Sequence, residues 1–470
     1  MSSQSTEPGA GMSRAERTQV ASAAEVREHV SRLDAALGFM ATMLPPAQPR
    51  PAAPFAGEPL LVKDLDLRLA GAPLWRGNHV LREHAVVSRR DDALGRLLRE
   101  LGFDIVGRTK SAEFGLAVTT EPLAYGPVHN PWDHDRSAGG SSGGSACAVA
   151  ARAVRVAHGT DLGGSLRIPA AHCGVFALKP GLARPATTPT FAAWNRHGFM
   201  TSRVDDLRRM LSVLGGDKAS GVGHAGTAGS TRRVRVGVLA SAVSSAVGVD
   251  DGAVEAVERI ADKLSDQGHQ VLRAHPWALE EFDQFTMKTT PMLAGWLAKE
   301  VADASEDLGR PLTETDMEPG TAQMLAMAAL APPGAGEETA TWLCRLVADL
   351  TAWWDRFDIL LSPTVPLQAP PLGWMSDPDT AMRRTFGMMQ YTAMFNASGH
   401  PAINVPCVGQ GVLPYGVQLV GAHGSEADLL DLAEQLTSGE APTPPGSFGI
   451  RPPRTRPLPE TDLTSPESTL

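Results

Sequence analysis

The spacing of apolar residues along the chain predicts alternating helices and strands. Apolar residues recur every three to four positions over residues 22–43, where Ser22 and Glu25 have the spacing of a capping box. Similar stripes with stop or capping signals predict further helices over residues 90–101, 202–214, 251–265 and 425–436. Short apolar runs predict strands at residues 60–62, 103–106, 233–239, 271–274, 359–361, 402–405 and 417–420.

This order of elements predicts an α/β fold, in which helices flank a large parallel or mixed sheet. The periodic pattern is absent from residues 1–20, which are rich in Ser, Gly, Glu and Thr, and from residues 439–470, which are dense in proline. We expect both segments to be disordered, because they cannot bury enough apolar surface to offset the loss of chain entropy. The sequence therefore predicts one domain over residues 21–438.

Composition is typical of a globular protein with a sizeable core. Of the 470 residues, 43% are hydrophobic and 20% are charged, and the formal net charge is −10. An acidic balance argues against nucleic acid or an anionic lipid surface as a partner. The sequence predicts neither a membrane span nor a signal peptide, so we expect a cytoplasmic protein.

Cysteine and histidine residues show no metal-binding pattern. The four cysteines have no CxxC spacing, and the thirteen histidines form no HExxH motif. Free buried thiols are therefore expected, and neither a metal nor another cofactor is predicted.

Lysine is rare in this chain. Only seven of the 42 basic residues are lysines, so arginine supplies most of the positive charge. Lys63 directly follows the predicted strand at residues 60–62. A lysine in an apolar run can lose its proton on burial, whereas an arginine stays charged. Lys63 is therefore a candidate for proton-transfer chemistry.

Two glycine-rich segments carry the other candidate residues. SAGGSSGGSACAVAARAV at residues 137–154 places four glycines around Ser141 and Ser142, and HGTDLGGSLRIPAAHCG at residues 158–174 places two glycines before Ser165. Glycines let the backbone approach a ligand closely, and N–H groups that converge in such a turn can bind an oxyanion. Taken singly, each segment is also compatible with an ordinary turn.

Two other interpretations of the first segment are less favoured. A phosphate-binding P-loop would end in GK[ST], which is absent. Residues 139–143 match GxSxG, the nucleophile elbow of α/β-hydrolases, but an elbow follows an apolar strand. Residues 133–137 are polar and are expected to form a loop.

Considered together, the segments resemble the amidase-signature family. GGSSGGSA at residues 139–146 is followed by GTDLGGSLRIPAAHCGVFALKP at 159–180, and Ser165 follows Ser141 by 24 positions. LVKDLDLRLAG at 61–71 and LPYGVQLVG at 413–421 also match the family. The resemblance covers about residues 55–437 and implies the amidase-signature fold, with a large central mixed sheet flanked by helices.

The resemblance implies a catalytic trio. Ser165 matches the nucleophile, Lys63 the general base, and Ser141 a bridging serine that follows a cis peptide bond in the family. An amide carbonyl is a poor electrophile, so the serine must be activated, and a lysine made neutral by burial could do this. The implied reaction is hydrolysis of a small or medium-sized linear amide through an acyl-enzyme, at a carbon–nitrogen bond other than a peptide bond.

Other positions match the surroundings of this trio. Arg167 could bind a substrate carboxylate or could be a structural arginine. Ser142 and Asp161 match positions that tie the two loops together. The N–H groups that match the family's oxyanion hole are those of Leu162, Gly163, Gly164 and Ser165.

Two stretches indicate a subgroup. TTEPLAYGPVHNPW at residues 119–132 and GRPLTETDMEP at 309–319 resemble the branch that contains 6-aminohexanoate-cyclic-dimer hydrolase. Trp75 and Arg76 depart from the pattern of many members and could reshape one wall of the pocket. Alternatives are the amidotransferase subunit of a tRNA-dependent complex, or acyl transfer to an amine. A small-molecule amide is the expected partner, and a homodimer is compatible with the sequence.

Overall fold

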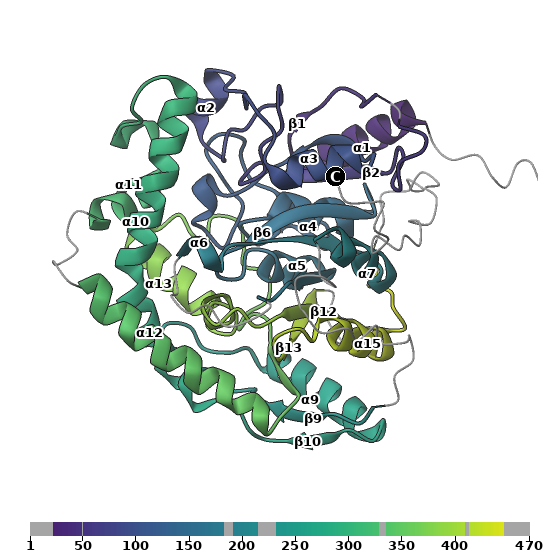
Figure 1. The fold of residues 1–470 in the computed structure, drawn as a ribbon, viewed down its shortest axis with the longest axis vertical. Coiled ribbons are helices and arrows are strands. Elements are labelled where there is room, and N and C mark those ends of the chain that lie inside the picture. The colour runs from purple at the N-terminus through teal and green to yellow at the C-terminus, as the bar shows by residue number, and fades with distance from the viewer. Residues whose placement is uncertain are drawn as a thin grey trace, which may run out of the picture.

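The computed structural model describes residues 22–48, 50–182, 191–214, 232–328, 335–408 and 413–445 (Figure 1). The disorder predicted for residues 1–20 and 446–470 lies outside this part. Residues 439–445, which we expected in the disordered tail, pack against the rest of the fold. The N–H of Ala441 donates to the Ser202 carbonyl at 2.9 Å, and Glu440 pairs with Arg203. The expected boundary at residue 438 is therefore too early.

An 11-stranded mixed sheet forms the centre of the molecule, as predicted. Its strand order is β1-β3-β2-β6-β8-β7-β12-β13-β11-β9-β10, with parallel pairing near both ends and antiparallel pairing through the middle. These strands are β1 Met40–Met43, β2 Pro59–Lys63, β3 Asp104–Thr109, β6 Val156–Asp161, β7 Phe176–Lys179, β8 Arg196–Thr201, β9 Arg235–Val238, β10 Gln270–Leu272, β11 Ile359–Pro363, β12 Ala402–Val408 and β13 Pro414–Gly421.

A separate antiparallel pair consists of β4 (His129–Asn130) and β5 (Asp133–Ser137). The loop that we expected at residues 133–137 is therefore a strand, although a polar and largely exposed one. Pairing with β4 holds these polar residues in an extended conformation.

Helices cover both faces of the sheet. Side chains alternate along β2, so Leu60 and Val62 join one core with α3, α7, α9 and α15, whereas Leu61 joins another with α1, α4 and α5. The helices are α1 Ala23–Leu37, α2 His79–Glu83, α3 Ala93–Glu100, α4 Gly143–Ala150, α5 Arg167–Cys173, α6 Phe191–Trp194, α7 Val204–Val213, α9 Asp251–Asp266, α10 Phe282–Leu308, α11 Pro319–Ala328, α12 Ala335–Ala352, α13 Pro378–Met388, α14 Met394–Ala397 and α15 Glu426–Thr437.

The first helix is shorter than its apolar pattern predicts. The capping box of Ser22 and Glu25 is present, but α1 ends at Leu37 because Gly38 adopts a left-handed conformation with φ 65°. Residues 40–43, which were expected in this helix, form β1 instead and pair with β3.

The helices expected over residues 202–214 and 425–436 begin without a side-chain cap. α7 begins after Arg203 rather than at Ser202. The hydroxyl of Ser425 donates to the Ala422 carbonyl at 2.7 Å and does not cap α15.

The topology brings the candidate residues to one edge of the sheet. β2 and β6 are parallel neighbours, so their carboxyl ends, at Lys63 and Asp161, lie at the same edge. Lys63 is on the same face of β2 as Leu61, which packs in the core that contains α4. Because α4 starts just after Ser141 and Ser142, the lysine faces the first glycine-rich loop.

Close packing of α4 gives a stability prediction. In Gly144→Ala, the new methyl group would lie 2.6 Å from the Phe39 carbonyl oxygen and 2.7 Å from main-chain atoms of Lys110. We expect a loss of about 1–3 kcal/mol in the free energy of unfolding, measured by urea denaturation. The matched control is Gly295→Ala in α10, which has open space around it and should gain about 0.5–1 kcal/mol. Equal effects of the two substitutions would contradict this account of the packing.

Candidate active site

The side chain of Lys63 points into a buried polar contact. Its Nζ lies 2.8 Å from Ser141 Oγ and 3.0 Å from Thr160 Oγ1. Lys63 has no exposed surface, and Ser141 is only 1% exposed. The structure thus brings together two of the three residues that the sequence predicted as the catalytic trio.

The two glycine-rich loops are joined by hydrogen bonds of Ser142. Its N–H donates to the Ser165 carbonyl at 3.2 Å, and its hydroxyl donates to the Thr160 carbonyl at 3.3 Å. The peptide bond between Gly140 and Ser141 is cis. Ser142 therefore holds the loop that carries Ser141 against the turn that carries Ser165.

Asp161 organises the turn before Ser165. Its carboxylate accepts hydrogen bonds from the N–H groups of Gly164 at 2.7 Å and Leu166 at 3.2 Å. The N–H of Gly164 is thus already used within the turn, although we expected it to contribute to the oxyanion hole. Leu162 and Gly163 line the cavity beside Ser165, where their N–H groups could meet a substrate.

Arg167 is a structural residue. Its guanidinium is fully buried and donates to Asp161 Oδ2 at 2.9 Å, Asn396 Oδ1 at 2.6 Å and Gln418 Oε1 at 2.8 Å. It is not among the residues that line the cavity. The carboxylate-binding alternative for Arg167 is therefore wrong, because every face of the group is occupied by the protein itself.

Burial determines the charge states in this region. Desolvation lowers the pKa of Lys63 to about 8, although the nearby charges of Asp66 and Asp161 act to raise it. Burial alone would raise the pKa of Asp161, but the guanidinium of Arg167 outweighs it and holds that pKa well below its usual range. The site thus combines a lysine that can be neutral near pH 8 with a permanently ionised carboxylate.

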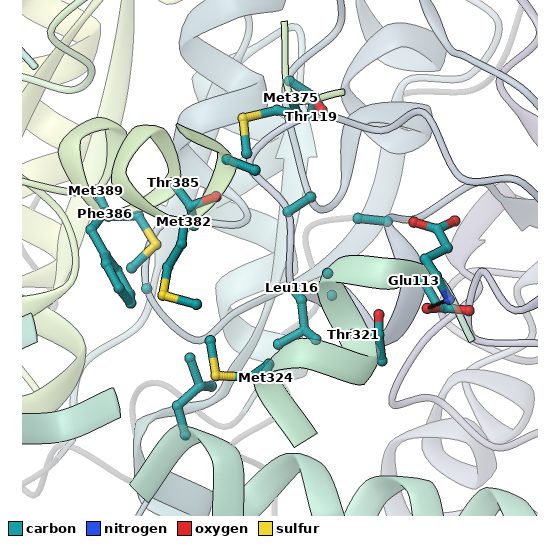
Figure 2. Close-up of a pocket in the computed structure, with 18 of the residues that line it drawn as sticks. Glu113, Leu116, Thr119, Thr321, Met324, Met375, Met382, Thr385, Phe386 and Met389 are labelled. Atoms are coloured by element: carbon teal, nitrogen blue, oxygen red, sulfur yellow. Dashed lines mark hydrogen bonds between the residues drawn. The ribbon is translucent and has the colours of Figure 1, made fainter. Parts of the chain in front are cut away.

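A cavity of about 460 Å³ opens beside Ser165 (Figure 2). Ser165 is partly exposed to it, and the wall around it comes from residues 112–123 and from α10, α11 and α13. Met324, Met375, Met382 and Met389 supply much of its apolar surface. Methionine side chains are flexible and adapt to ligands of different shape.

Several buried polar residues near the motifs pack in the core and do not line the cavity. Burial lowers the pKa of His172 to about 4 and raises that of Cys173, and neither lines the cavity. His158 contacts His197 at 3.0 Å, and Lys179 donates to the His400 carbonyl at 2.7 Å.

Trp75 and Arg76 do not form the wall of the cavity. Arg76 is buried and pairs with Asp307 at 2.8 Å, while Trp75 packs in a core with α10 and α11. The expected reshaping of the pocket by these two side chains is therefore not direct, since both lie behind the lining residues.

Within the described ranges, no three His, Cys, Asp or Glu side chains gather as metal ligands would. Over the same residues, no helix combines the length and apolarity that a bilayer crossing requires.

The chain matches the Amidase family model over residues 33–430. It is 34% identical to 6-aminohexanoate-cyclic-dimer hydrolase of Paenarthrobacter ureafaciens, and the alignment covers 82% of this chain and 83% of that relative. The chain belongs to the amidase family. The predicted resemblance to this family is thereby confirmed, and membership supports hydrolysis of a carbon–nitrogen bond.

Two further similarities within the family are informative. A solved structure of 6-aminohexanoate cyclic dimer hydrolase complexed with substrate has a TM-score of 0.79 and 30% identity, covering 92% of this chain and 96% of that one. A glutamyl-tRNA(Gln) amidotransferase subunit of Methanococcoides burtonii is 29% identical, covering 81% of this chain and 84% of that relative. Sequence relatives of this chain thus carry different names.

The sequence did not single out two features of this amidase. Thr160 stands inside the GTD motif, but only the pairing of β6 beside β2 shows that its hydroxyl contacts Lys63. The cavity wall comes from segments far apart in the chain, and its methionines look like ordinary core residues in the sequence. The high methionine content, 16 residues, was the one available signal.

The assignment of Arg167 as structural leads to a second prediction. Arg167→Met would leave the Asp161 carboxylate buried without its partner, which should cost about 3–5 kcal/mol of unfolding free energy. Chemical denaturation measures this loss. The control, Arg310→Met, removes an exposed partner of Asp316 and should change stability little. An Arg167→Met protein of unchanged stability, impaired only in KM, would restore the substrate-binding role.

Proposed function

We propose that this chain hydrolyses the amide bond of a small or medium-sized linear amide through Lys63, Ser141 and Ser165. The observation that carries the proposal is the 2.8 Å contact between Lys63 Nζ and Ser141 Oγ, buried beside the loop of Ser165. A lysine with a pKa of about 8 is poised to exchange a proton with that hydroxyl near neutral pH.

In the proposed first half-reaction, neutral Lys63 takes the proton of Ser141 while Ser141 takes the proton of Ser165. The Ser165 Oγ then forms a bond to the amide carbon, and the carbonyl oxygen becomes an oxyanion. Backbone N–H groups of Leu162, Gly163 and Ser165 would stabilise this charge. We leave Gly164 out of this set because its N–H already donates to Asp161.

Collapse of the tetrahedral intermediate breaks the carbon–nitrogen bond. Ser141 gives its proton to the leaving amine and takes one from protonated Lys63, which becomes neutral again, and the acyl group stays on Ser165. Water then repeats the sequence: it loses a proton toward Ser141 and Lys63 and attacks the acyl carbon. The bond from that carbon to Ser165 Oγ breaks, Ser165 regains its proton from Ser141, Ser141 regains one from Lys63, and the acid is released. The Lys63–Ser141 contact and the hydrogen bond from the Ser142 N–H to the Ser165 carbonyl support this proton path.

Ser165→Ala and Lys63→Ala should each lower kcat by about a thousandfold or more, because the nucleophile or its activation is lost. Turnover of an amide panel, read by mass spectrometry, measures the change. A fluorophosphonate probe should add to Ser165 in the unmodified protein and not in Ser165→Ala. Exposed controls are Lys299→Ala and Ser245→Ala, which should keep full activity. Full turnover by a folded Ser165→Ala protein would refute the assignment.

The pH dependence gives a separate prediction. Protonated Lys63 cannot accept a proton, so kcat/KM should rise with pH and reach half its maximum near pH 8. Lys63→Arg should show no activity at any pH, since arginine stays protonated. An activity that falls as pH rises from 6 to 9 would contradict the role of a neutral lysine.

Product analysis separates hydrolysis from acyl transfer. In the presence of added amines, a hydrolase releases mainly the free acid, whereas an acyltransferase would convert most of the acyl group to a new amide. Purification of the chain with stable partner subunits would instead favour the amidotransferase alternative.

A further inference from the structure

The cavity beside Ser165 has two chemically different sides. Figure 2 shows Met382, Phe386 and Met389 on one side and Glu113 on the other, close to Thr321. The apolar side lies against the turn before Ser165, since a methyl group added to Gly163 would come within 3.1 Å of the Met389 side chain. A bound amide would therefore have its reactive group near an apolar surface, in a cavity that also has an acidic side.

The acidic side consists of three carboxylates that have no cationic partner in the cavity lining. Glu113, Glu121 and Glu318 all line the cavity, and no Lys, Arg or His among the described residues does so. Glu318 Oε1 accepts the Leu123 N–H at 2.7 Å, which links the segment of Glu121 to the start of α11. The two segments therefore lie side by side, and we call their three glutamates the acidic wall.

Glu113 differs from the other two glutamates because the protein itself occupies both of its carboxylate oxygens. Its carboxylate accepts hydrogen bonds from Asn78 Nδ2 at 2.8 Å and from the Glu318 N–H at 2.9 Å, so both oxygens are occupied. Its charge nevertheless acts on its neighbour: burial, together with Glu113, raises the pKa of Glu318 to about 7. A cation in the cavity would relieve this repulsion between like charges.

One carboxylate oxygen of Glu121 accepts no hydrogen bond from the described residues. Its Oε2 accepts the Gly373 N–H at 2.7 Å, whereas among the described residues no donor contacts its buried Oε1. The Glu121 carboxylate thus has an oxygen without a donor, and no cationic side chain among the described lining residues balances its charge. A protonated amine provides both the donors and the positive charge that this wall lacks.

We propose that the cavity selects amides whose apolar chain ends in a protonated amine, bound by Glu121 and Glu318, and rejects amides that end in a carboxylate. This specificity rests on the hydrolysis proposed above. The apolar side, with Met324, Met382 and Met389, accommodates the alkyl chain, while a carboxylate would meet acidic side chains and, among the described lining residues, no cationic one.

The test uses three nitroanilides of equal chain length. The acyl groups are 6-aminohexanoyl, heptanoyl and the monoacyl group of pimelic acid, so the chains end in ammonium, methyl and carboxylate. A second series of benzamides, with the same three ends on the amine side, covers the reverse orientation in the cavity. In at least one series, kcat/KM should decrease from ammonium to methyl to carboxylate, with about tenfold or more between the first and the last.

Variants then locate the selectivity. In the Glu121→Gln, Glu318→Gln double variant, the ratio of kcat/KM for the ammonium amide to that for the methyl amide should fall by about tenfold. The matched control is Glu314→Gln, an exposed glutamate four positions before Glu318, which should leave this ratio unchanged. Equal kcat/KM for all three ends in both series, or an unchanged ratio in the double variant, would overturn the proposal.

Two outcomes distinguish a failure of the proposed hydrolysis from a failure of the proposed specificity. If Ser165 neither turns over an amide nor reacts with a fluorophosphonate, the proposed function itself is wrong and the specificity falls with it. If Ser165 reacts with the probe but none of the amides is cleaved, binding is measured by protection of Ser165 from the probe. Hexylamine should then protect better than hexanoate, and equal protection would overturn the acidic-wall proposal.

Discussion

The rest of the site depends on the burial of one amine against one hydroxyl, those of Lys63 and Ser141. Removing an ammonium group from water is costly, and the structure meets this cost by lowering the pKa of Lys63 to about 8 rather than by pairing it directly with a carboxylate. Two hydroxyl groups, of Ser141 and Thr160, satisfy its hydrogen bonds. This arrangement requires the end of β2, the end of β6 and the loop before α4 to lie close together. The hydrophobic core that β2, β6 and α4 share holds them there.

A second buried pair joins the two halves of the sheet at this edge. Asp161 holds the turn before Ser165, and Arg167 connects that carboxylate to Asn396 and Gln418, which come from the C-terminal third of the chain. Because both charges are fully buried, neither can be removed alone without leaving the other uncompensated. The geometry of the turn is therefore tied to the integrity of the whole sheet.

The candidate catalytic residues and the residues that line the cavity come from different parts of the chain. Lys63 lies at the end of a strand, and Ser141 and Ser165 lie in short glycine-rich turns whose backbones pack closely against neighbouring segments. The walls come from the segment over residues 112–123 and from α10, α11 and α13 with the residues that flank them, and together these carry the methionines and the three glutamates. Such a division lets relatives with one fold act on different molecules, because wall residues change without disturbing the catalytic residues.

The motifs were enough to predict the family, the large sheet with flanking helices, and the contact of Lys63 with Ser141, because the family's glycines and serines keep a fixed spacing along the chain. They also indicated that burial could lower the pKa of Lys63. The motifs did not show that α1 is followed by a strand after Gly38, that the Arg167 guanidinium binds Asp161, or that the Gly164 N–H donates within its own turn, because these depend on how the segments pack. The acidic wall likewise escaped prediction, since Glu121 and Glu318 lie nearly 200 positions apart and only the packing of α11 against the segment of Leu123 brings them together. Contacts of this kind depend on which distant segments share a surface, and no local pattern encodes that.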